Sequence, residues 1–141
     1  MAANRLIQHD VDITAFGHPY GFIPESGDFV EVDKTLLAIA HEVAREKGID
    51  LLEGVVATGD QFIASEERRN FIIHTYEADA TEMEGASVAY VCDCLGVPFF
   101  VLRSISDAAD MDAGFNFDAF LKSSAKISAE FALAMVAKLS K

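Results

Sequence analysis

The chain has 141 residues, of which 11 are Lys or Arg and 23 are Asp or Glu, so its formal net charge is −12. The apolar fraction of 51% excludes a disordered polymer, and the length favours one domain over residues 1–141. Scarce cations exclude a nucleic-acid surface, and the negative charge argues against binding to an anionic membrane.

No apolar run approaches the roughly 20 residues that span a bilayer, and the first residues lack the apolar core of a secretory signal. Cys92 and Cys94 are two residues apart in a helical pattern, so their side chains point in different directions and neither bridge nor share a metal. Free thiols fit a reducing compartment, and we expect a cytoplasmic protein.

Short β-like runs alternate with amphipathic helices along the chain. Strands are predicted over Asp10–Phe16, which alternates polar and apolar residues, and over Leu51–Thr58, Ala78–Glu82 and Pro98–Arg103. Helices are predicted over Lys34–Lys47 with an Asp33 cap and a Gly48 stop, Ser65–His74, Glu84–Leu95, and from Asn116 to the C-terminus. This order predicts an α/β fold with a largely parallel sheet covered by helices.

Open α/β sheets bind ligands beyond the carboxyl ends of their strands. Acidic and aromatic residues follow the predicted strands here, so we expect a site at that edge. Two interpretations of the Glu82-Met83-Glu84 run remain open. The run either takes part in binding or only begins a helix, because acids stabilise a helix start. Ser106 and Asp107 likewise fit either a helix cap or a site beside the most apolar strand.

The four histidines have no metal-ligand spacing, and we interpret each as a solvated or packed side chain. They are His9, His18, His41 and His74. The sequence also lacks the HExxH, P-loop and GxGxxG motifs, which argues against metal hydrolysis and nucleotide triphosphate chemistry.

Four segments closely resemble the bacterial 5'-methylthioadenosine/S-adenosylhomocysteine nucleosidases of the nucleoside phosphorylase superfamily. They are DITAFGHPYG (12–21), ATGDQFI (57–63), TEMEGA (81–86) and VLRSISDAAD (101–110). The resemblance implies hydrolysis of the N-glycosidic bond of methylthioadenosine and S-adenosylhomocysteine in methionine salvage, with release of adenine and with no cofactor or metal. It also implies a partial nucleoside-phosphorylase-like, three-layer fold.

Residue roles follow from the same resemblance. Asp107 matches the acid that protonates the departing adenine, with Ser106 orienting it and Arg103 organising its hydrogen bonds. Glu84 matches the ribose-binding carboxylate, Met83 packs beside the sugar, and Glu82 lies near the attacking water. Phe62 matches the residue that stacks on the purine, the Ile63 backbone reads the edge of the base, and Phe117 closes the apolar side. Ile13, Phe16 and Pro24 match residues that line the partner subunit's pocket in a homodimer.

The family is longer than this chain, which corresponds to its carboxyl-terminal three-fifths. The first strands of the family's sheet, and the Glu that activates the water, have no counterpart here. Because the Glu is absent, we expect the chain alone to be inactive. Because strands are absent, we also expect it to be oligomeric or paired with the absent segment. A fragment, a cleavage product and a shortened polypeptide all stay open. Two rival functions also stay open: a purine nucleoside phosphorylase, and a nucleoside-binding or storage relative without catalysis.

Overall fold

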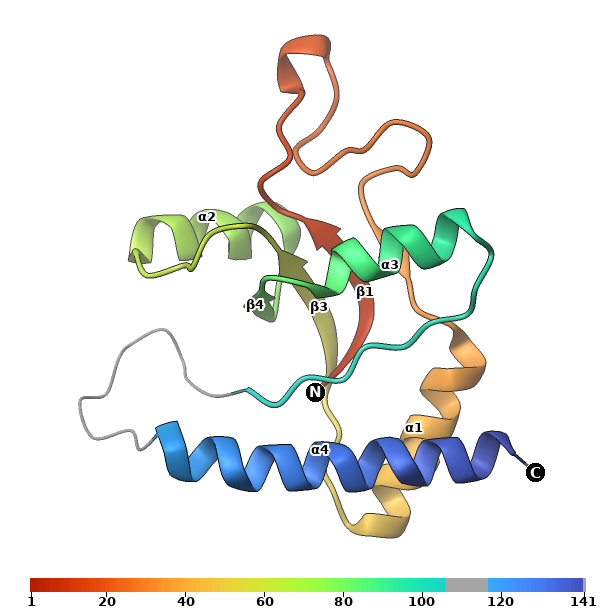
Figure 1. The fold of residues 1–141 in the computed structure, drawn as a ribbon. Coiled ribbons are helices and arrows are strands. Elements are labelled where there is room, and N and C mark those ends of the chain that lie inside the picture. The colour runs from red at the N-terminus through yellow and green to blue at the C-terminus, as the bar shows by residue number, and fades with distance from the viewer. Residues whose placement is uncertain (106–116, 141) are drawn as a thin grey trace.

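The computed structural model describes residues 1–105 and 117–140. Its sheet has four strands in the order β2 (Val30–Glu31), β1 (Ala2–Gln8), β3 (Glu53–Thr58) and β4 (Ala80–Glu82). Figure 1 shows β1, β3 and β4 between the helices. β3 runs parallel to both β1 and β4, whereas β2 is antiparallel to β1. Gln8 pairs with Thr58, and Thr58 pairs with Glu82, so the three parallel strands end level with one another. The expected mixed, mostly parallel sheet is confirmed.

The prediction of a first strand over Asp10–Phe16 is wrong. The strand is β1, and residues 14–16 form a 3-10 helix, η1 (Thr14–Phe16). The Asp12 carboxylate accepts hydrogen bonds from the backbone N–H of Thr14 at 2.9 Å and from its hydroxyl at 2.7 Å. This local turn competes with strand pairing and explains why the polar and apolar alternation misleads.

Helix α1 (Lys34–Lys47) has the bounds that the sequence predicts. The Asp33 side chain accepts a hydrogen bond from the Leu36 N–H at 2.8 Å, which caps the first turn. Gly48 ends the helix in the left-handed conformation at φ 65°, where a side chain would be strained.

Helices α2 (Glu66–Tyr76) and α3 (Gly85–Cys94) cover opposite faces of the sheet. Alternate residues of a strand point to opposite sides, so Ile7 and Val55 pack on the α2 side while Leu6 and Val56 pack on the α3 side. Both helices lie within one or two residues of their predicted bounds. Ser65 caps α2 by accepting the Arg68 N–H at 3.2 Å.

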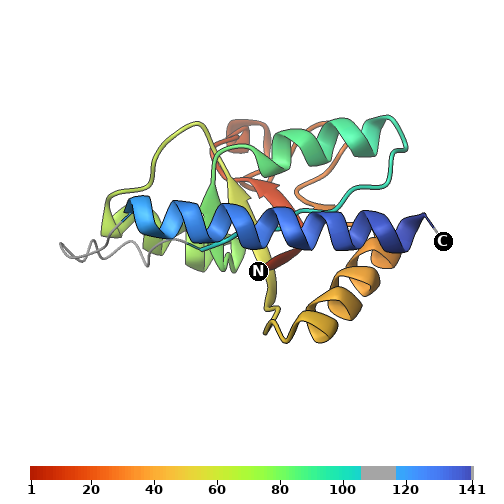
Figure 2. The same cartoon turned by 60° about the horizontal axis from the view of Figure 1, so that its bottom comes forward.

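Helix α4 (Phe117–Leu139) crosses α1, and these two helices form a third packed cluster around Phe131 (Figure 2). Lys138 near the end of α4 binds Glu42 and Glu46 of α1 at 2.8 and 2.7 Å. None of the described helices combines the length and apolar character that a bilayer crossing requires.

The strand predicted over Pro98–Arg103 is also wrong as a regular strand. The segment makes an isolated antiparallel bridge between Leu102 and Ala2 and hydrogen bonds to the backbone of Met1 and Ala3. It therefore lies against the start of β1 without entering the sheet ladder, and the backbone of Arg103 pairs with Met1 there.

Candidate functional site

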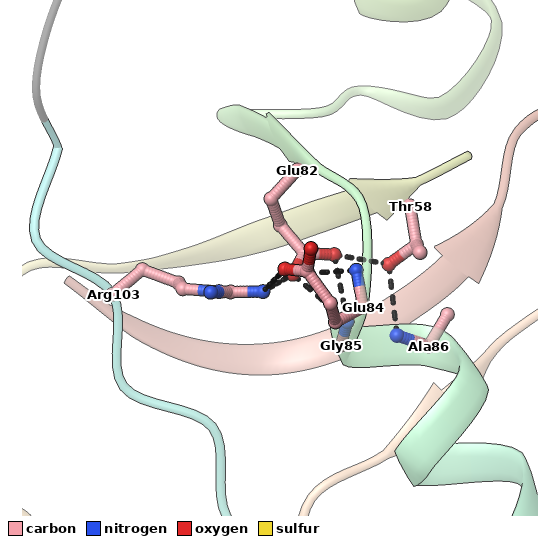
Figure 3. A network of polar contacts seen from close by, with 6 residues as sticks. All are labelled: Thr58, Glu82, Glu84, Gly85, Ala86 and Arg103. Atoms are coloured by element: carbon pink, nitrogen blue, oxygen red, sulfur yellow. Dashed lines mark hydrogen bonds and ion pairs between the residues drawn. The ribbon is translucent and has the colours of Figure 1, made fainter. Parts of the chain in front are cut away.

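The carboxyl ends of β3 and β4 bring together three of the predicted site residues. Thr58 ends β3, Glu82 ends β4, and the chain then turns through Met83 and Glu84 into α3. Arg103 reaches this point from the extended segment that follows α3, as Figure 3 shows. Residues separated by more than forty positions in the chain therefore share one polar network.

Glu82 is the centre of this network. Its side chain is 11% exposed, and its carboxylate accepts a hydrogen bond from the Thr58 hydroxyl. The Gly85 N–H lies 2.9 Å from one of its oxygens and 2.8 Å from the other. The Glu84 N–H donates to it at 3.2 Å, and the Arg103 guanidinium forms an ion pair with it. Glu82 thus stabilises the start of α3, one of the two interpretations that the sequence left open, while it also holds Arg103.

Thr58 was missed by the sequence analysis. Its side chain is fully buried, and its hydroxyl donates to Glu82 while accepting the Ala86 N–H at 2.8 Å. The Ala86 N–H lies in the first turn of α3, where no carbonyl of the helix is available to it. A polar residue at the end of the apolar run Val55–Ala57 was the signal that could have identified it.

Glu84 and Arg103 form the exposed side of the network. Arg103 Nη2 lies 2.8 Å from Glu84 Oε2, and the Glu84 side chain is 70% exposed. Burial lowers the pKa of the Arg103 guanidinium, and its buried Nε has no hydrogen-bond partner among the described residues. Glu84 therefore presents a carboxylate to solvent beside a cation that Glu82 holds in place.

Phe62 and Ile63 lie in the turn that joins β3 to α2. Phe62 is 73% exposed, which leaves its ring open to a ligand, whereas Ile63 packs against the α2 core cluster. Met83 is partly exposed beside Glu84. Aromatic, apolar and acidic groups thus follow two adjacent parallel strands at the edge where α/β sheets bind ligands.

Three of the remaining candidates lie between β1 and β2, and the others lie at or beyond the limits of the described residues. Phe16 and Pro24 are exposed and Ile13 is half-buried, in the long segment between β1 and β2. Ser106 and Asp107 lie outside the described residues, and Phe117 is described only as the first residue of α4. Within the part of the chain that the structure describes, no group of three His, Cys, Asp or Glu side chains could hold a metal ion.

The profile of the phosphorylase superfamily matches residues 1–138. The chain belongs to this superfamily. The aminodeoxyfutalosine nucleosidase of Helicobacter pylori (strain ATCC 700392 / 26695) is 56% identical over 139 residues, which cover 99% of this chain and 60% of the relative. The 5'-methylthioadenosine/S-adenosylhomocysteine nucleosidase of Geobacillus sp. (strain WCH70) is 39% identical over 141 residues, with 99% and 61% covered.

Solved structures of similar proteins belong to the same kinds of nucleosidase as these sequence relatives. The crystal structure of the Campylobacter jejuni 5'-methylthioadenosine/S-adenosyl homocysteine nucleosidase has a TM-score of 0.94 and 52% identity, with 97% of this chain and 60% of that chain covered. The Helicobacter pylori futalosine hydrolase has a TM-score of 0.90 and 54% identity, with 97% and 58% covered. This superfamily chain therefore spans about three fifths of the length of its relatives, and its expected nucleoside-phosphorylase-like fold is confirmed.

Proposed function

We propose that the complete protein hydrolyses the N-glycosidic bond of 5'-substituted adenine nucleosides and releases adenine. The observation that carries the proposal is the exposed Glu84 carboxylate, paired with Arg103 at the carboxyl edge of the sheet. The turn that carries the exposed Phe62 ring leaves β3 at the same edge. The similarity to proteins named as nucleosidases supports hydrolysis as the reaction.

Glu84 is proposed to bind the ribose. As the bond to the base breaks, the sugar develops positive charge, and a carboxylate that accepts hydrogen bonds from ribose hydroxyls both fixes the ring and stabilises that charge. Glu84 would exchange its solvent contacts for the ribose, and Met83 would pack against the sugar. Because Arg103 also pairs with Glu82, it can keep its place when Glu84 turns to the substrate.

Phe62 is proposed to stack on the purine, with the Ile63 backbone reading its edge and Phe117 closing the apolar side. Adenine is a poor leaving group as an anion, so an acid must donate a proton as the bond breaks, a contribution of about 10²–10⁴-fold in rate. We assign this acid to Asp107, oriented by Ser106.

Glu82 is proposed to position the site near the attacking water. The Glu82 carboxylate accepts hydrogen bonds from Thr58 and Gly85, and it forms an ion pair with Arg103. These contacts occupy both oxygens of the Glu82 carboxylate. We therefore infer that Glu82 holds Arg103 and the start of α3, and that it is not the base that activates the water.

A homodimer is proposed to complete the pocket for the 5' group. Phe16 is 82% exposed, and it lies with Ile13 and Pro24 in the segment that projects beyond the sheet (Figure 1). An exposed aromatic side chain of this size is favourable to bury against a partner subunit.

The proposed substrates are the nucleosides that the relatives' names indicate. These are aminodeoxyfutalosine, as in the Helicobacter relative at 56% identity, and methylthioadenosine or adenosylhomocysteine, as in the Geobacillus relative at 39%. Adenine release from each should be measured by chromatography on the complete gene product, with and without phosphate. Equal release without phosphate supports hydrolysis. Release that requires phosphate indicates a phosphorylase, and binding without release indicates a non-catalytic relative.

The acid is tested by Asp107→Asn in the complete protein. An amide cannot donate a titrating proton, so we expect adenine release to fall by about 10²-fold or more while nucleoside binding remains measurable. Turnover close to that of the wild type would remove Asp107 from this role.

A further inference from the structure

His9 is a buried titratable residue that the proposed chemistry does not use. It directly follows β1, its side chain is 2% exposed, and its N–H donates to the Thr58 carbonyl at 2.8 Å. Its own carbonyl accepts hydrogen bonds from the Tyr76 hydroxyl at 3.0 Å and from Arg68 Nη2 at 3.2 Å. Helix α2 therefore anchors His9 at the level where β3 ends.

The surroundings favour the neutral imidazole. Arg68 Nη2 lies 3.4 Å from Nδ1, and a guanidinium can only donate, so Nδ1 accepts and the ring proton is on Nε2. Burial lowers the pKa of His9, and the charge of Arg68 acts in the same direction, whereas Asp10 acts in the opposite one. Protonation would place a second donor, Nδ1–H, against the guanidinium.

The Nε2 side of the ring packs against Gly59. A Cβ added at Gly59 would lie 2.4 Å from Nε2 and 2.5 Å from Cε1 of His9, so the ring would have to move. The same Cβ would lie 3.0 Å from Asp10 Oδ2. The glycine does not have a positive φ, so the position requires small size and not an unusual backbone conformation. The buried Nε2 has no hydrogen-bond partner among the described residues, so the contact is one of shape.

Two further hydrogen bonds fix the turn that follows β3 at Gly59 and Asp60. The Gly59 N–H donates to the Glu82 carbonyl at 3.1 Å, and the Asp60 N–H donates to Asp10 Oδ2 at 2.6 Å. The backbone that leaves β3 is thus fixed between the His9-Asp10 pair and β4. Phe62 lies only three residues beyond Gly59, so the direction of this turn determines where its ring lies.

We propose that His9 is a positioning residue for purine recognition, and that its neutral ring, fitted against Gly59, sets the path of residues 60–63. The inference rests on the proposed function, because it assigns the purine to Phe62 and Ile63. Protonation of His9 breaks the fit to Arg68, so affinity for the base falls at acid pH.

The contact is tested by a double-mutant cycle in the complete gene product, with adenine affinity measured by calorimetry. His9→Ala and Gly59→Ala should each weaken adenine binding about tenfold. Gly59→Ala should add no more than about threefold in the His9→Ala background, where the ring is gone and Asp10 Oδ2 is the remaining close atom. His74→Ala, an exposed histidine on α2, is the matched control and should bind adenine as the wild type does. Equal effects of Gly59→Ala in both backgrounds would overturn the proposal.

A conservative variant separates positioning from folding. His9→Gln keeps a long neutral side chain against Gly59, so its adenine affinity at pH 7.5 should stay within threefold of the wild type, with KM affected more than kcat. Between pH 7.5 and 5.5 the wild type should lose more affinity than this variant, and parallel pH profiles would contradict the role. Wild-type protein that neither binds nor releases adenine would instead refute the proposed function.

Discussion

Replacing Thr58 by Val tests the polar network most sharply, because the two side chains have nearly the same shape. The hydroxyl donates to the Glu82 carboxylate and accepts the buried Ala86 N–H at 2.8 Å. A hydrogen bond to a charged group contributes about 1.5–3 kcal/mol, and a buried donor left without a partner costs about 1–3 kcal/mol. Glu82 keeps its bonds from Gly85 and Arg103, so we expect a loss of about 2–4 kcal/mol in the free energy of unfolding.

Urea denaturation at fixed protein concentration measures this loss by linear extrapolation. Thr58→Ser is the matched control, since it keeps the hydroxyl and removes one methyl group, at a cost of about 1 kcal/mol. The reasoning predicts that the Ser variant is clearly more stable than the Val variant. It is refuted if Val is as stable as the wild type, or if Ser is the less stable of the two.

Three further predictions concern packing, capping and pH. Phe131→Ala should lower the free energy of unfolding by about 3–5 kcal/mol, because the ring is 2% exposed between α4 and α1. The exposed Lys126→Ala on the same helix should change it by less than about 0.5 kcal/mol, and equal effects would contradict the packing. Ser65→Ala should cost about 1 kcal/mol and Ser65→Asp close to nothing; a loss with Asp as large as with Ala would argue against a capping role. Because burial lowers the pKa of His9, the unfolded chain binds a proton near pH 6.5 that the folded chain does not, so stability should fall as the pH drops below about 6.5. Denaturation of the wild type and His9→Gln from pH 7.5 to 5 should show the wild type losing more, and parallel curves would contradict this sign.

Local signals were sufficient for the helices. Asp33 and Gly48 bound α1 because a carboxylate cap and a left-handed glycine act within one turn, where sequence neighbours determine the geometry. Ser65 worked in the same way for α2.

Strands were less predictable because their partners lie far away in the sequence. Ala2–Gln8 is covered on both faces and carries little alternation, so it was missed, while the alternating Asp10–Phe16 run folds onto its own Asp12. Pro98–Arg103 has an apolar pattern, but its pairing with β1 is limited to an isolated bridge at the start of that strand.

The candidate site was also predictable only where it depends on residues close together in the sequence. The predicted parallel order placed Glu82 and Glu84 at the carboxyl end of a strand, where the structure has them, because chain connectivity alone decides which residues follow a strand. The pairing of Arg103 with both carboxylates and the bridge from Thr58 depend on register between strands. No pattern within a single segment contains that information.

The division of the nucleoside between Glu84 and Phe62 is the central claim, and one binding measurement tests it directly. The complete Glu84→Gln protein is titrated calorimetrically with adenine and with a 5'-thioadenosine nucleoside. We predict that nucleoside affinity falls by about tenfold or more, while adenine affinity stays within twofold of the wild type. Equal losses for both ligands, or no loss for either, would contradict the assignment of Glu84 to the ribose.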